Sequence, residues 1–203
     1  MRYPEGMRLL DLGCGKGVLT DHLLAKPDDS ITGIDVDHES LVAAKRRFPE
    51  REFIQARGEQ LPIASGSFDR VFCNLSLPYM HIPTAMREIR RVLKSDGDAL
   101  LAIHHPSFTL QELKNSRNLK AILFRVYVLL SGLCFHVTGY HLPKESFQTE
   151  RGMRIALRRA GFSECVLFPL RKRIMVHARL VESSATGIPL DGYSSTTAGR
   201  ELN

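Results

Sequence analysis

The sequence predicts an α/β fold with a mostly parallel sheet at its centre. Apolar runs of strand length alternate with segments of helical spacing, and the first run, Leu9–Leu12, leads directly into a glycine-rich loop that ends at Gly17. The chain has 203 residues, of which 43% are hydrophobic, so it can bury one sizeable core. We expect one domain over residues 1–181. The apolar periodicity then stops, which predicts a flexible tail over residues 182–203.

The glycine loop joins the first strand to a predicted helix over residues 18–26. It has the pattern Asp11-x-Gly13-x-Gly15-x-Gly17. Glycine adopts unusual backbone angles and lets a ligand approach the main chain, and the start of a helix presents free N–H groups. A dinucleotide fingerprint would need glycine or alanine where Val18 stands. We therefore expect a nucleotide-type cofactor with a cationic group that meets Asp11.

A second apolar run, residues 31–36, contains a carboxylate about 20 residues beyond the loop, where an acid that binds ribose is expected. Asp35 is the candidate, because a carboxylate accepts charge-assisted hydrogen bonds from hydroxyl groups. Asp37 is interpreted as the N-cap of a helix over residues 39–48. The alternative, in which Asp35 only caps that helix, remains open.

These residues resemble motif I and the following strand of the class I S-adenosylmethionine-dependent methyltransferases. The pair Leu61-Pro62 and the run Ser67-Phe68-Asp69 are similar to the subgroup that contains quinone-biosynthesis and small-molecule methyltransferases. The resemblance implies a Rossmann-like, seven-stranded, mostly parallel sheet with helices on both faces and a reversed C-terminal hairpin. It also implies S-adenosylmethionine as the cofactor. The cofactor-binding residues implied in this part of the chain are Asp11, Gly13, Cys14, Gly15, Gly17, Asp35 and Val36.

The sequence departs from the family at the expected adenine contact. Members of the subgroup usually have an aspartate that bonds the adenine amino group, and here that position is Arg57. Arginine only donates hydrogen bonds, so it cannot accept one from that amino group. We expect the backbone at Arg57 and Gly58 to hold the adenine, with the carboxylate of Glu59 as a further acceptor. The alternative is that Arg57 is only a solvated side chain.

The following segments continue the predicted sheet. A strand over residues 70–74 ends at Asn74, which is expected to face the cofactor because ligands bind beyond the carboxyl ends of parallel strands. No Asn-Pro-Pro-aromatic motif follows, which argues against a DNA base as substrate. A helix over 83–94, a turn at 95–97 with Gly97 in the left-handed conformation, and a strand over 99–103 come next. A helix over 145–160 and paired strands over 163–168 and 174–181 complete the fold.

A histidine pair follows the strand over 99–103. The methyl group of the implied cofactor is already activated, so alignment of the acceptor is the main task. A hydroxyl acceptor would also need a proton acceptor, and His105 is the candidate catalytic residue, with His104 beside it. Further candidates are Tyr79, His81 and His141. No metal is expected, since the four cysteines lack metal-ligand spacing; their scatter favours a reduced compartment.

Residues 105–144 form a predicted insertion at the cofactor side of the sheet. Its apolar character makes it the candidate lid and implies a small, apolar or aromatic methyl acceptor. Residues 119–137 are strongly hydrophobic, but Lys120 and Arg125 interrupt the run, so we do not expect it to span a membrane. A peripheral membrane contact through 119–137, and simple core packing, both remain open.

The net charge of +6 does not by itself select a partner. Nucleic acid is not expected, because no RNA-binding module is recognisable. The polar start, residues 1–6, predicts no signal peptide, so we expect a cytoplasmic protein. The sequence thus predicts an S-adenosylmethionine-dependent methyltransferase acting on a small molecule. A partner-dependent or non-catalytic cofactor-binding subunit, and an RNA or protein methyltransferase, remain alternatives.

Overall fold

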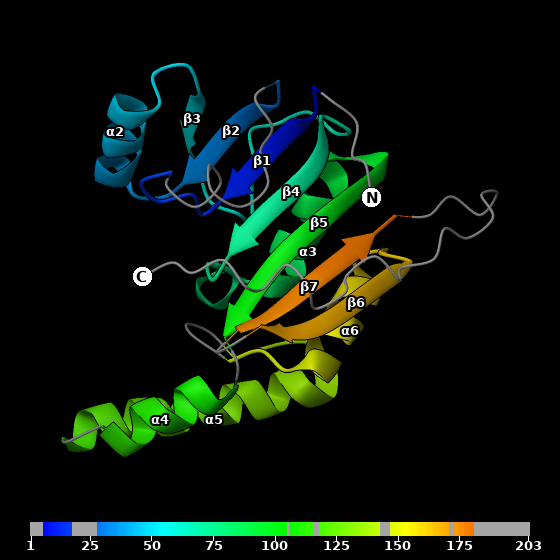
Figure 1. Cartoon of the computed structure of the whole chain (residues 1–203). Coiled ribbons are helices and arrows are strands. Elements are labelled where there is room, and N and C mark those ends of the chain that lie inside the picture. Colours follow the sequence, from blue (N-terminus) through cyan, green and yellow to red (C-terminus); the bar gives the residue numbers. More distant parts are fainter. Residues whose placement is uncertain are drawn as a thin grey trace.

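A seven-stranded sheet forms the centre of the computed structural model, with the strand order β3-β2-β1-β4-β5-β7-β6 (Figure 1). The structure describes residues 6–17, 28–104, 106–115, 118–142, 147–170 and 173–180. The strands are β1 (Arg8–Leu12), β2 (Ser30–Asp35), β3 (Glu52–Gln55), β4 (Phe68–Asn74), β5 (Leu93–His104), β6 (Glu164–Leu170) and β7 (Arg173–Arg179). Strands β1 to β5 pair in parallel, whereas β7 runs antiparallel to both β5 and β6. The predicted fold class and the reversed hairpin are confirmed.

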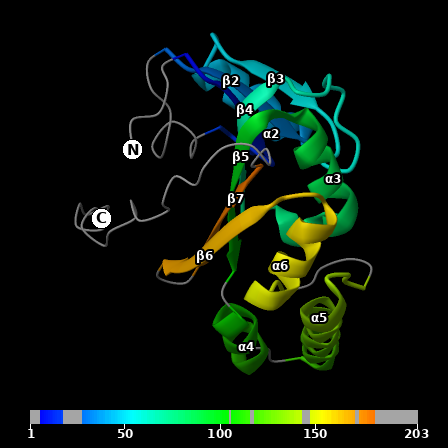
Figure 2. The same ribbon diagram turned by 90° about the vertical axis from the view of Figure 1, so that its right-hand side faces the viewer.

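The described helices are α2 (His38–Arg47), α3 (Ile82–Val92), α4 (Pro106–Asn115), α5 (Leu119–Thr138) and α6 (Glu150–Arg159), with a 3-10 turn η1 (Leu77–Tyr79). Helices α3 and α6 lie on the same face of the sheet (Figure 2). Their apolar sides, for example Met86 and Leu157, join Leu10, Leu101 and Val176 of the strands in the larger hydrophobic core. Helices α4 and α5 follow β5, so they begin at the carboxyl end of the parallel strands.

Helix α2 begins where the sequence predicts a cap. The carboxylate of Asp37 accepts hydrogen bonds from the backbone N–H groups of Glu39 and Ser40, both at 3.3 Å. The hydroxyl of Ser40 donates to the same carboxylate at 2.6 Å, and this hydrogen bond lowers the pKa of Asp37. Asp37 is therefore the N-cap of α2, as predicted. Asp35 lies at the end of β2 and has different hydrogen-bond partners.

Some predicted boundaries are wrong. The helix predicted over residues 83–94 ends at Val92, because Leu93 and Lys94 belong to β5. No left-handed turn interrupts residues 95–97, because β5 is continuous from Leu93 to His104 and a register shift against β4 absorbs the irregularity. Gly97 instead permits close packing, since a Cβ there would lie 3.1 Å from the carbonyl oxygen of Asp69. Helix α6 begins at Glu150 rather than 145, because the hydroxyl of Thr149 accepts a hydrogen bond from the N–H of Gly152 and caps it. The predicted helix over 18–26 and the tail over 182–203 lie outside the described residues.

A buried ionic group fastens the C-terminal hairpin to the parallel strands. The guanidinium of Arg70 on β4 donates to both carboxylate oxygens of Asp98 on β5, at 2.5 and 2.6 Å. His177 on β7 lies 2.8 Å from the same carboxylate, and the three residues are between 3 and 6% exposed. Burial favours the neutral carboxyl, but the hydrogen bonds from His177 and Arg70 together outweigh it and keep the pKa of Asp98 below its ordinary value.

Candidate functional site

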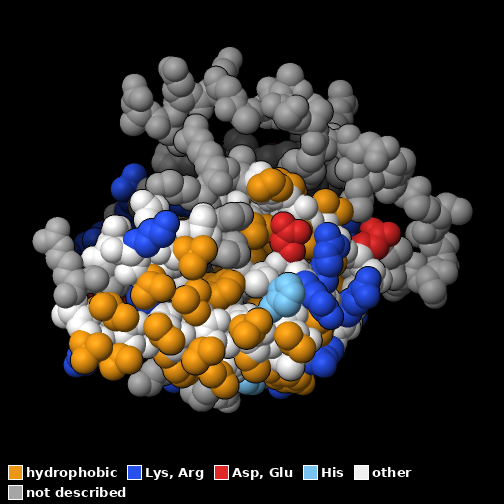
Figure 3. Space-filling view, turned by 90° about the horizontal axis from the view of Figure 1, so that it is seen from below, with side chains coloured by type: hydrophobic (Ala, Val, Ile, Leu, Met, Phe, Trp, Pro, Cys, Tyr) orange, Lys and Arg blue, Asp and Glu red, His pale blue; other side chains and the backbone are white. Residues whose placement is uncertain are grey.

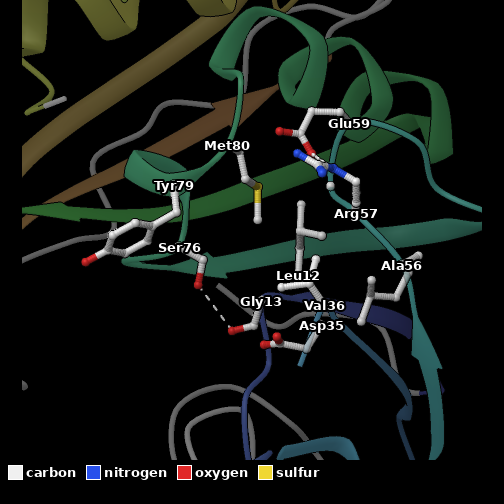
Figure 4. A pocket seen from close by; sticks show the side chains of 12 residues that line it. Leu12, Gly13, Asp35, Val36, Ala56, Arg57, Glu59, Ser76, Tyr79 and Met80 are labelled. Atoms are coloured by element: carbon white, nitrogen blue, oxygen red, sulfur yellow. Dashed lines mark hydrogen bonds and ion pairs between the residues drawn. The ribbon is translucent and has the colours of Figure 1, made fainter. Parts of the chain in front are cut away.

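A pocket of about 430 Å³ lies at the carboxyl ends of the central strands (Figure 4). In open parallel sheets this edge is where ligands bind, since loops of neighbouring strands diverge there. The pocket is lined by Leu12, Gly13, Ile34, Asp35, Val36, Ala56, Arg57, Gly58, Glu59, Ser76, Tyr79 and Met80. The lining therefore combines the end of β1, the end of β2, the segment after β3 and the turn after β4.

The glycine loop is held in place from two sides. The N–H of Gly13 donates to the carbonyl oxygen of Ile34 at 2.7 Å, and the hydroxyl of Ser76 donates to the carbonyl oxygen of Gly13 at 3.2 Å. Gly13 has a φ of 73°, and a Cβ there would lie 2.3 Å from the hydroxyl oxygen of Ser76. Only glycine satisfies both the backbone angle and the available space. The loop thus brings bare backbone to the pocket wall.

Asp35 lies at the end of β2 and lines the pocket. One carboxylate oxygen accepts a hydrogen bond from the N–H of Gly15 at 2.8 Å, and the other accepts one from the N–H of Asp37 at 3.0 Å. These contacts fix the orientation of the carboxylate. Because each carboxylate oxygen has more than one acceptor site, both oxygens can still accept hydrogen bonds from a ligand. This geometry suits the predicted ribose contact.

The segment after β3 forms the opposite wall. The side chain of Arg57 is 76% exposed and its guanidinium lies 3.6 Å from the carboxylate of Glu59. Glu59 also accepts a hydrogen bond from the N–H of His81 at 2.8 Å. A Cβ on Gly58 would lie 2.5 Å from the sulfur of Met80, so glycine lets this wall approach the methionine closely. Arg57, Gly58 and Glu59 all line the pocket, and their contact with adenine stays a prediction.

The other predicted cofactor residues lie around the pocket and do not line it. These are Asp11, Cys14, Gly15, Gly17 and Asn74. Asp11 is buried on β1, beneath the loop, and burial together with the charges of Asp11 and Asp35 raises the pKa of the Cys14 thiol to about 12. Asn74 accepts a hydrogen bond from Arg173 at 3.1 Å. The segment 18–27 that follows the loop lies outside the described residues.

The proposed proton acceptors are spread over two places. His105 lies outside the described residues. His104 ends β5 and stacks on Phe108 of α4, with ring centroids 4.4 Å apart. Burial first, and the nearby charge of Arg173 second, lower the pKa of His104, so its ring is neutral near neutral pH and can accept a proton.

His141 connects the loop after α5 with the pocket rim. Its Nε2 accepts a hydrogen bond from the N–H of Ile82 at 3.1 Å, and its ring lies 5.8 Å from that of His81. Tyr79 and Met80, which directly precede His81 and Ile82 in the chain, line the pocket. Tyr79 is 69% exposed. This rim is therefore shared between the pocket and the segment predicted as a lid.

Sequence reasoning missed Ser76 and Met80, which no motif singles out. Ser76 contacts Gly13 across 63 positions of sequence, and Met80 meets Gly58 only because the turn after β4 folds back over the pocket. The structure itself marks this turn. Leu75, directly after β4, has a φ of 60°, which is uncommon for a residue with a side chain. Such strained positions cluster at functional sites.

Comparison with known proteins agrees with this geometry. Residues 10–101 match a family described as a methyltransferase domain. The chain is 34% identical to an uncharacterized methyltransferase of Synechocystis sp., over 53% of this chain and 52% of that protein. It is 26% identical to a demethylmenaquinone methyltransferase of Chlorobaculum parvum, over 83% and 72% of the two chains. It is 31% identical to a malonyl-[acyl-carrier protein] O-methyltransferase of Laribacter hongkongensis, over 95% and 62%. The chain thus spans about half the length of the Synechocystis relative.

Solved structures share the fold. An S-adenosylmethionine-dependent methyltransferase from Methanosarcina mazei superposes with a TM-score of 0.61 at 20% identity, over 89% of this chain and 95% of that one. A chain from the complex between the Haloferax volcanii Trm112 methyltransferase activator and a methyltransferase gives a TM-score of 0.65 at 16% identity, over 90% and 86%. The glycine loop, the matched domain and the shared fold agree. Residues 10–101 are therefore similar to a methyltransferase domain, and the chain shares the Rossmann-like fold of solved S-adenosylmethionine-dependent methyltransferases.

Proposed function

We propose that this protein transfers a methyl group from S-adenosylmethionine to a small, apolar or aromatic acceptor. The observation that carries the proposal is the pocket in which the glycine loop and Asp35 meet at the carboxyl ends of β1 and β2. The residues fit the cofactor of the family, because Gly13 leaves room for a ligand at the backbone and Asp35 offers oriented acceptor oxygens. When bound, S-adenosylmethionine supplies a methyl group on a positively charged sulfur.

Each wall of the pocket has a separate task in this proposal. Asp35 accepts hydrogen bonds from the ribose hydroxyls, and the backbone of Arg57 and Gly58 borders the adenine. Asp11, buried beneath the loop, contributes negative charge near the methionine part, where the cofactor is cationic. Glu59 is held by His81, and it offsets the positive charge of Arg57 at the adenine wall.

The acceptor side is the rim formed by Tyr79 and Met80. An aromatic ring and a thioether favour contact with an apolar or aromatic molecule. The relative named as a demethylmenaquinone methyltransferase supports an aromatic acceptor. The protein aligns the acceptor atom with the methyl group and excludes water, and a neutral His104 or the adjacent His105 takes the proton if the acceptor is a hydroxyl.

Calorimetry tests the cofactor step first. The wild-type chain is titrated with S-adenosylmethionine and with its demethylated product, and the titration is repeated with Asp35→Ala. The matched control is Glu52→Ala, which removes an exposed carboxylate from neighbouring β3 outside the pocket lining. We expect binding by the wild type and the control, and loss of at least about tenfold in affinity for Asp35→Ala, because it removes charge-assisted hydrogen bonds. Equal affinities for all three proteins would contradict the site.

Turnover decides between the main proposal and a partner-dependent subunit. The alternative is favoured by the structural similarity to a chain from a complex that contains a methyltransferase activator. Purified single chain is incubated with radiolabelled S-adenosylmethionine and a panel of quinols and phenols. Methyl transfer to one of them supports independent catalysis. A chain that binds the cofactor normally, yet transfers methyl only when a partner protein is added, would establish the alternative.

A further inference from the structure

Helix α5 carries an exposed apolar stripe along its whole length. The stripe consists of residues spaced alternately by four and three positions, so they share one side of the helix. Its members are Leu119, Leu123, Val126, Leu130, Leu133 and Val137, and each is between 41 and 71% exposed. The outward side of a helix on a water-soluble domain normally carries polar residues, so this stripe needs a partner.

The opposite side of α5 packs firmly on the domain. Val128, Gly132 and Phe135 are buried, and a Cβ on Gly152 of α6 would lie 2.4 Å from the ring of Phe135. Helix α5 is long and apolar enough to cross a membrane by length and composition. Because α5 is attached to α6 along one side, the stripe is on the side that remains open to lipid. The geometry therefore favours a helix that lies along a surface.

Helix α4 widens the apolar surface beside the stripe. Phe108 and Leu110 of α4 are exposed large hydrophobic residues, as is Tyr140 directly after α5. In the view from below, apolar side chains cover much of the face formed by the two helices (Figure 3). We call the outward surface formed by the stripe and the neighbouring helix α4 the α4–α5 face. A surface two helices wide is broader than the seam that a single partner helix needs.

Positive charges stand at both ends of the α4–α5 face. Lys114 and Lys120 are exposed where α4 ends and α5 begins. At the other end, the exposed Arg159 stacks on the ring of Tyr140 at 4.7 Å and donates to the carbonyl oxygen of Thr138. Among the described residues of α4 and α5, one is acidic. It is Glu112, and its carboxylate forms an ion pair with Arg125 at 3.0 Å. The face thus complements a negatively charged apolar surface.

We propose that the α4–α5 face docks on the surface of a lipid bilayer that contains anionic lipids. The stripe then lies at the boundary of headgroups and acyl chains, with Lys114, Lys120 and Arg159 near lipid phosphates. A second copy of the chain is disfavoured as the occupant, because each copy would bring like charges to the other and the chain has a net charge of +6. The docking goes beyond the proposed methyl transfer and does not depend on it.

The docked face also reaches the acceptor rim of the pocket. His141, which follows α5, accepts the hydrogen bond from Ile82 beside Tyr79 and Met80. Leu142 donates from its N–H to the hydroxyl of Ser131 at 3.1 Å, which ties this loop back to the helix. An apolar acceptor dissolved in the bilayer would therefore arrive next to the rim.

Vesicle flotation with the full chain tests the proposal. Vesicles of phosphatidylcholine alone are compared with vesicles that also contain phosphatidylglycerol. The disrupting variant carries Leu123→Glu, Leu130→Glu and Leu133→Glu, which leave the buried side of α5 unchanged. The control for a surface glutamate is Val42→Glu, which places one such charge at an exposed position on α2. We expect the wild type and the control to float with the anionic vesicles, and the triple variant to lose at least about tenfold in affinity.

A second measurement avoids disruption of the helix. The chain has no tryptophan, so Leu130→Trp introduces a single fluorophore in the stripe. We expect a blue shift of its emission on addition of anionic vesicles, which weakens as salt rises. An unchanged emission and no flotation of the wild type would overturn the proposal. A stable dimer that the triple variant converts to monomer would overturn it too, by identifying a second copy as the occupant. Calorimetry with S-adenosylmethionine on the same variants reports separately on the cofactor site.

Discussion

Replacing Arg70 with methionine tests whether the buried group on β4, β5 and β7 holds the sheet together. The guanidinium donates two charge-assisted hydrogen bonds to Asp98, at 2.5 and 2.6 Å, and both side chains are almost fully buried. Arg70→Met removes both bonds and leaves Asp98 with His177 as its remaining partner in the group. Removing one member of a buried ion pair typically costs about 3–5 kcal/mol, and we expect Arg70→Met to lower the free energy of unfolding by this amount.

The assay is equilibrium urea unfolding, with thermal unfolding as a second probe. For a domain of this size the expected loss corresponds to a decrease of about 10 °C in Tm. The matched control is Lys94→Met, which removes the other ion pair between β4 and β5. Lys94 lies 2.7 Å from Asp69, but the pair is partly exposed, so its loss should cost at most about 1 kcal/mol.

A cost for Arg70→Met no larger than that for Lys94→Met would refute the reasoning. The pH dependence gives a further check, because the folded pKa of Asp98 lies below its ordinary value. The stabilisation from Asp98 is therefore present above its unfolded pKa and is lost as pH falls through the folded pKa. In Arg70→Met the folded pKa rises, so the acid loss of stability should begin at higher pH. The double variant Arg70→Met with Asp98→Leu should regain part of the stability, since no buried charge is left without its partner.

Three further predictions concern the pocket and the residues around it. Gly13→Ala should weaken S-adenosylmethionine binding by at least about tenfold in calorimetry. The control is Gly66→Ala, because Gly66 has a similar positive φ but open space around the added Cβ. This control should cost about 1 kcal/mol of stability and leave the affinity for the cofactor unchanged. The pKa of His104, followed by proton NMR, should lie below its ordinary value and rise in Arg173→Gln, and no rise would exclude the charge of Arg173 as a cause. Cys14, whose pKa is raised to about 12, should resist iodoacetamide near pH 8 in the folded protein, as read by mass spectrometry, and rapid alkylation would contradict its burial.

The sequence predicts those features that short stretches of chain encode. The glycine loop after β1, the cap at Asp37 and the reversed C-terminal hairpin depend on residues within about one element of each other, and all three are confirmed. The prediction of a turn at 95–97 is wrong because the conformation there depends on residues far away in the sequence. Gly97 instead relieves a tight contact, since a Cβ there would lie 3.1 Å from the carbonyl oxygen of Asp69 on the neighbouring strand, and a reading of nearby residues cannot reveal this contact.

The candidate site divides in the same way. Asp35, Arg57 and Glu59 follow strands at positions that a pattern can identify, and the structure brings them to one pocket. Ser76 and Met80 reach the pocket because the turn after β4 folds toward the loop after β1, and that arrangement depends on the sheet order. A hydrogen bond between residues 63 positions apart leaves no local trace in sequence.

The hydrogen bond from Ser76 to the carbonyl oxygen of Gly13 has a consequence for the order of ligand binding. It connects the loop that we propose to hold the cofactor with the turn that we propose to border the methyl acceptor. A ligand that immobilises the loop also immobilises the turn, so a second ligand meets a wall whose ordering entropy has already been lost. Coupling of this kind is reciprocal. The methyl acceptor should therefore bind more tightly to the protein loaded with the demethylated cofactor than to the empty protein, and by the same factor the acceptor should raise the affinity for that product.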